Sequence, residues 1–92
     1  MTTLVLETEP LAIEVAVSDI VLSLTLDDGR QLAVPTVWFP RLLSGSQQSR
    51  DRWELIGRGQ GIHWPELDED ISVAGLLAGR RDQKKPAKTK AA

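Results

Sequence analysis

The 92-residue chain contains no cysteine and no tyrosine, and it has only one histidine and one phenylalanine. Without cysteine it cannot form disulfides, thiolate metal sites or cysteine nucleophiles, so zinc-finger and thiol redox functions are excluded. No apolar stretch approaches the roughly 18 residues of a membrane span, and the start, MTTLVLETEPLA, does not resemble a signal peptide. We therefore expect a soluble, cytoplasmic protein that does not associate with membranes.

Hydrophobic residues make up 41% of the chain and charged residues 26%, which is ordinary globular composition for one domain. Residues 1–79 hold five basic and twelve acidic side chains, a net charge of −7, whereas residues 80–92 hold six basic and one acidic, a net charge of +5. The second segment has no apolar residue larger than alanine, so it cannot offset the entropy of ordering. We predict a single domain over 1–79 and a disordered basic tail over 80–92.

Alternation of apolar and polar side chains predicts strands at 12–17 and 20–26, with Ile13 facing the same side as the later valines of the first strand. The dipeptide Asp28-Gly29 predicts a two-residue type I′ hairpin turn. A third antiparallel strand then follows at 30–34 and ends at Pro35.

The rest of the chain alternates short helical and short extended patterns. The predicted elements are helices at 38–43, 47–52 and 73–78 and extended segments at 53–56 and 62–64. The sequence therefore predicts an α+β fold. In it, an antiparallel meander grows to three to five short strands, and two or three short helices pack on one face.

The stretch GIHWPELDEDISVAGLLAG, residues 61–79, places the one histidine near an acidic cluster. His63 with Asp68, Glu69 and Asp70 contains donor types that bind zinc, iron or manganese. The three acids are consecutive, however, so their side chains project in different directions. We therefore predict no metal site here.

Helix capping explains more of the same stretch. Ser72 has the position of an N-cap and Gly79 that of the glycine after a helix end. Ile71 and Leu76 fall at the two positions of a hydrophobic staple. We therefore interpret this segment as an acidic turn that leads into a capped helix.

Other common sites are also missing. Gly57, Gly59 and Gly61 lead into an extended segment and not into a helix, so they predict a hairpin or bulged connection and not a phosphate-binding loop. No serine lies in a G-x-S-x-G motif, and only one histidine could act as a base. We predict that the protein is not an enzyme and binds no cofactor.

Tryptophan and arginine are the candidate partner-binding residues, because both are enriched at interface hot spots. The tryptophans can equally form the aromatic core of a small domain. Arg50, Arg52 and Arg58, with one more arginine upstream, can form a positive face or an ordinary solvated surface. The candidate partner-binding residues are Trp38, Arg41, Trp53 and Trp64.

The strings LDDGRQLAVPTVWFPRLL and RDRWELIGRGQGIHWPELDEDISVAGLLAG resemble the bacterial family known as domain of unknown function 2442. The resemblance covers about residues 13–79. It implies a small α+β domain without an established catalytic role. It also implies a small protein partner encoded nearby, since such pairs have been suggested to be toxin and antitoxin. Other members of the family carry an added helix-turn-helix, whereas this chain has a basic tail.

Two functions therefore remain open from the sequence. The first is a non-enzymatic protein-interaction module, the antitoxin-like or regulatory half of a two-protein system. The alternative is a nucleic-acid-associated regulator that binds phosphates through its tail. The basic residues of that tail are Arg80, Arg81, Lys84, Lys85, Lys88 and Lys90.

Overall fold

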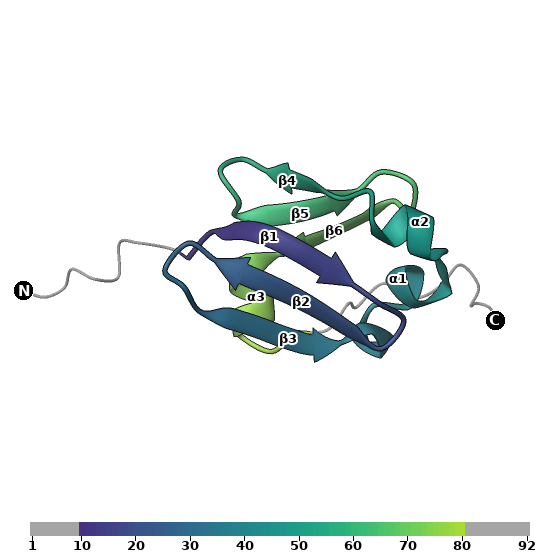
Figure 1. The fold of residues 1–92 in the computed structure, drawn as a ribbon, viewed down its shortest axis with the longest axis horizontal. Coiled ribbons are helices and arrows are strands. Elements are labelled where there is room, and N and C mark those ends of the chain that lie inside the picture. Colours follow the sequence, from purple (N-terminus) through teal and green to yellow (C-terminus); the bar gives the residue numbers. More distant parts are fainter. Residues whose placement is uncertain (1–9, 81–92) are drawn as a thin grey trace, which may run out of the picture.

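A computed structural model describes residues 10–80, which form two small antiparallel sheets, three short α-helices and a 3-10 turn (Figure 1). Sheet A has the order β1-β2-β3 and comprises β1 (Ala12–Val17), β2 (Val21–Leu26) and β3 (Gln31–Pro35). Both connections are hairpins. The predicted meander is confirmed, and its bounds agree to within one residue.

The alternation of sheet A has one interruption. Val15 and Val17 point into the core as expected, but a β-bulge between Ala12 and Glu14 turns Ile13 outward, where it is exposed. An extra residue in one strand shifts the side-chain order by one position. The expectation that Ile13 shares the buried face was therefore wrong.

The β2–β3 hairpin has a three-residue loop in place of the predicted type I′ turn. Gly29 has φ +93°, whereas Asp28 does not have a positive φ. Leu26 N–H donates to Arg30 O at 2.9 Å, and Gly29 N–H donates to Leu26 O at 3.0 Å. The Asp28 carboxylate accepts from Arg30 N–H. This arrangement is typical of a type I turn followed by a glycine bulge.

The predicted helix at 38–43 is divided into η2 (Thr36–Trp38) and α1 (Pro40–Ser44). Phe39 separates them with extended backbone, because the ring of Pro40 disfavours helical geometry in the residue before it. The next helix, α2 (Gln47–Arg50), is shorter than predicted.

Ser46 caps α2 as expected, since its Oγ accepts from Ser49 N–H at 3.1 Å. The helix is also tied to sheet A. Gln47 Nε2 donates to Val17 O at 2.6 Å. α2 is thus fixed beside the end of β1 (Figure 1).

Sheet B has the order β4-β5-β6 and comprises β4 (Glu54–Ile56), β5 (Gly61–Trp64) and β6 (Glu69–Ser72). The strand β6 was not predicted, because its first two residues belong to the acidic cluster that was interpreted as a turn. Acidic residues are depleted in strands. Even so, Glu69 and Ile71 are buried while Asp70 and Ser72 are exposed, as the period of a strand requires.

The last helix, α3 (Val73–Leu77), has the predicted caps. Ser72 Oγ accepts from Gly75 N–H at 2.7 Å. Gly79 has φ +79°, and Arg80 N–H reaches back to Gly75 O at 2.9 Å. This 6→1 bond, with Gly79 N–H on Leu76 O, is the Schellman motif.

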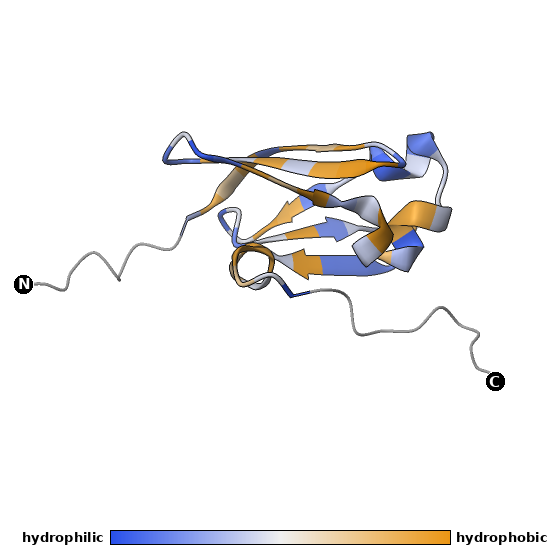
Figure 2. Ribbon diagram, turned by 90° about the horizontal axis from the view of Figure 1, so that it is seen from below, coloured by the Kyte–Doolittle hydropathy of each residue, from blue (hydrophilic) through white to orange (hydrophobic). Residues whose placement is uncertain are grey.

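The two sheets form two layers (Figure 2), and one cluster of buried apolar residues from both sheets makes up the core. The predicted α+β class is confirmed. The later strands form a second sheet, however, and do not extend the meander, so this sheet covers sheet A together with the helices. The sheets meet where Ala12 N–H donates to Gly59 O at 2.8 Å.

Candidate functional site

The three tryptophans have different environments. Trp64 is 0% exposed, and its Nε1 donates to Arg50 O at 3.0 Å. It is therefore part of the core and is not accessible to a partner in the folded protein. Trp38 and Trp53 are half-buried and pack against the core, which leaves part of each indole at the surface.

Arg50 lies neither on a positive face nor on a solvated surface, so both alternatives are wrong for this residue. Arg50 is only 7% exposed. Its Nη1 donates to Leu42 O at 3.0 Å, Leu43 O at 3.3 Å and Gly45 O at 2.6 Å. These carbonyls lie at the C-terminal end of α1, where helices leave acceptors without helical partners. Arg50 is thus a structural residue that closes α1.

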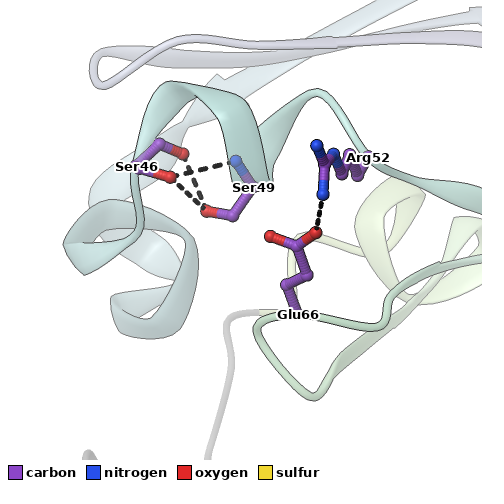
Figure 3. A network of polar contacts seen from close by, with 4 residues as sticks. All are labelled: Ser46, Ser49, Arg52 and Glu66. Carbon is purple, nitrogen blue, oxygen red and sulfur yellow. Dashed lines mark hydrogen bonds and ion pairs between the residues drawn. The ribbon is translucent and has the colours of Figure 1, made fainter.

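Two other arginines are paired with the loop between β5 and β6. Arg52 Nη1 forms an ion pair with Glu66, beside the Ser46–Ser49 hydrogen bonds of α2 (Figure 3). Arg41 Nη1 donates to Asp68 O and lies 3.6 Å from Asp68 Oδ2. These contacts tie the helical segment to the loop, and they pair two of the arginines with acidic residues.

The most exposed large apolar side chains of residues 10–80 lie together at one end of the fold. Ile20, in the β1–β2 turn, is 75% exposed, and Val37, in η2, is 62% exposed. Thr36 joins the two segments, because its N–H donates to Ile20 O at 3.0 Å and its Oγ1 donates to Ser18 O at 2.9 Å. We call Ile20 and Val37 the apolar end.

Sequence reasoning did not select the apolar end. The alternating pattern of the sequence places Ile20 in a strand. Val37 lies between the predicted strand at 30–34 and the predicted helix at 38–43 and belongs to no predicted element. The available signal was an isoleucine directly after Ser18-Asp19, a turn sequence whose serine accepts hydrogen bonds from Ile20 N–H and Val21 N–H. Tight turns lie at the protein surface, so a large apolar side chain in such a turn is expected to be exposed.

The outer face of sheet B carries His63 between two acidic residues. The strand register places Glu54 and Asp70 opposite His63, and His63 Nδ1 is hydrogen-bonded to the Asp70 carboxylate. This hydrogen bond raises the pKa of His63 above its usual value, although partial burial opposes it. The negative charges of Asp70, Glu54 and Asp68 also raise this pKa.

We expect the His63–Asp70 pair to make stability depend on pH. Because the folded-state pKa of His63 is raised, its contribution is complete below the unfolded value of about 6.5 and is lost as pH rises through the folded pKa. The melting temperature should therefore rise more between about pH 8 and about pH 6 for wild type than for Asp70→Asn, as thermal unfolding at the two pH values measures. An equal pH dependence in the two proteins would contradict the assignment.

Within residues 10–80, no group of three histidine or acidic residues is arranged to hold a metal ion. Arg80, the first basic residue of the predicted tail, is exposed. The other tail residues, Arg81, Lys84, Lys85, Lys88 and Lys90, lie outside the described residues.

The fold is similar to two solved structures. A protein of unknown function from Rhodospirillum rubrum ATCC 11170 is 30% identical with a TM-score of 0.73, and the match covers 84% of this chain and 95% of that chain. An uncharacterised protein from Chromobacterium violaceum is 25% identical with a TM-score of 0.68, over 82% of this chain and 71% of that chain.

No curated protein shows significant similarity to the chain. In the part of the chain that the structure describes, no helix has the length and apolar character needed to cross a membrane. Residues 12–82 match the family described as protein of unknown function DUF2442, as the resemblance predicted, and the chain therefore belongs to this family.

Proposed function

We propose that this chain is a non-enzymatic protein-interaction module and that its partner is a second small protein. The observation that supports this proposal is the apolar end. Ile20 and Val37 are aliphatic residues that residues 10–80 leave exposed, and the hydrogen bond from Thr36 N–H to Ile20 O joins their backbone segments. Burying each of them fully against a partner would contribute about 1.5 to 3 kcal/mol before the costs of association.

Two of the candidate residues from the sequence follow Val37 closely along the chain. Trp38 follows Val37 directly and is half-buried, and Arg41 lies three residues further on in α1. Tryptophan and arginine are enriched at interface hot spots, so these two residues stay candidates for the same partner. Trp53 remains a candidate, whereas the burial of Trp64 removes it from the proposed surface.

The finer part of the proposal is that the chain is the antitoxin-like or regulatory member of a two-protein system. This part rests on what the family resemblance implies and not on a residue of the fold. It specifies the partner to test first, namely the product of an adjacent gene.

Co-expression with the products of the flanking genes tests the proposal. We expect one of them to copurify with wild type in fixed stoichiometry and to be lost from the double variant Ile20→Ser, Val37→Ser. The matched control is Ile13→Ser, Leu77→Ser, which also places two serines at exposed apolar positions. Copurification that both double variants retain, or both lose, would contradict a role for the apolar end.

A second candidate function follows from the charge of the tail. Residues 80–92 carry +5, and a basic segment binds phosphates with a strong dependence on salt. Replacing Lys84, Lys85, Lys88 and Lys90 by glutamine in the full chain should then abolish DNA or RNA binding. Protein binding through the apolar end should survive the same change.

A further inference from the structure

The outer face of sheet B is a second open surface, and it differs in chemistry from the apolar end. Its register rows are Glu54–His63–Asp70 and Ile56–Gly61–Ser72. Four of the six residues are exposed. A shallow depression lies over the second row, and its lining residues are Ile56, Gln60, Gly61, Asp70, Ile71 and Ser72.

The chain leaves the described fold beside this depression. Arg80 N–H is bonded to Gly75 O, and Gly75 N–H is bonded to Ser72 Oγ. A β-carbon placed on Gly75 would lie 2.9 Å from Ser72 Oγ and 3.8 Å from Arg80 Cδ. Arg80 and Ser72 therefore both lie against Gly75, and Ser72 lines the depression.

Charge distinguishes this face from the corresponding face of sheet A. Glu54 and Asp70 lie on the sheet B face, and the exposed Asp68 lies two residues before Asp70. The outer face of sheet A, by contrast, carries Glu14 among small and neutral residues. Residues 81–92 contain five basic side chains and one acidic, a net charge of +4. The segment is complementary to sheet B and not to sheet A.

We propose that residues 81–92 bind back onto the outer face of sheet B. Lysine ammonium groups lie beside Glu54 and Asp70, and the aliphatic part of a lysine covers Ile56 in the depression. Twelve extended residues reach about 40 Å, while three strands span only about 10 Å. The segment is thus long enough to cross the whole face, and in this position its charges are unavailable to other anions.

The single histidine provides a direct reporter, because His63 lies between Glu54 and Asp70. We compare wild type with a full-length variant that carries Lys84→Gln, Lys85→Gln, Lys88→Gln and Lys90→Gln. Bound positive charge opposes protonation of His63, so NMR titration should give a higher His63 pKa in the variant. The difference should vanish near 1 M salt, where the Debye length is about 3 Å.

A synthetic peptide of residues 81–92, added to the quadruple variant, locates the contact. We expect shifts of the amide signals of Ile56, Gly61 and Ser72, with those of Ala16 and Ala33 on sheet A unchanged. Adding Glu54→Gln and Asp70→Asn to the variant should abolish these shifts. An unchanged His63 pKa at low salt, or peptide shifts confined to sheet A, would overturn the proposal.

Discussion

Replacing Arg50 by methionine should lower the free energy of unfolding by about 3 kcal/mol, because the α1 carbonyls lose a buried charged donor. Nη1 of Arg50 serves three of them, at Leu42, Leu43 and Gly45. Methionine fills much of the same volume, so the loss is mainly that of hydrogen bonds. A domain of this length has a total stability of roughly 5 to 10 kcal/mol, so the change is a large fraction of it.

Arg52→Met is the matched control for this prediction. The same chemical change removes an ion pair with Glu66 whose side chains are 57% and 42% exposed. Exposed pairs contribute about 0 to 1 kcal/mol. Urea unfolding followed by the tryptophan fluorescence of the chain measures both variants. Equal losses of unfolding free energy in Arg50→Met and Arg52→Met would contradict a stabilising role for the buried hydrogen bonds of Arg50.

Gly59→Ala should destabilise the fold by about 3 kcal/mol or more, since two costs combine at this position. Gly59 has φ +116°, a conformation that side chains rarely adopt. The new β-carbon would also lie 2.3 Å from Ala12 O, which is backbone and cannot move away without shifting β1. The substitution therefore strains the point where the two sheets are joined.

Gly29→Ala separates these two costs. Gly29 also has a positive φ, +93°, but a β-carbon there would have no atom within 4 Å. We expect a loss of about 1 to 2 kcal/mol from the backbone alone. Denaturant unfolding of both variants gives the difference, which is the contribution of the close approach to Ala12. Equal losses of unfolding free energy in Gly59→Ala and Gly29→Ala would contradict the close approach of Gly59 to Ala12.

Local signals in the sequence predicted the parts of the fold that local physics determines. The alternation of β1 and β2 depends on one buried face, and the caps Ser46, Ser72 and Gly79 act within a few residues. Those features were therefore recognisable. β6 is different, because its strand conformation depends on pairing with β5 and its acidic residues conceal the alternation.

The candidate surface could be predicted only in part, for the same reason. Sequence alone left open whether the tryptophans are core or interface, and only the packing between the sheets shows that Trp64 is core. Nothing local indicates that Arg50 is buried, since its acceptors belong to the preceding helix. The role of Trp38 and Arg41 in partner binding stays a prediction.

The bonds that fix β1 also limit how another chain can attach to sheet A. β1 is an edge strand, yet Ala12 N–H is bonded to Gly59 O and Val17 O accepts from Gln47. The bulge at Ile13 further disturbs this edge, and the opposite edge strand ends in Pro35, which has no N–H to donate. Sheet A is thus protected against intermolecular strand pairing and aggregation along β1. A partner at the apolar end would be recognised through side chains and not through an added strand.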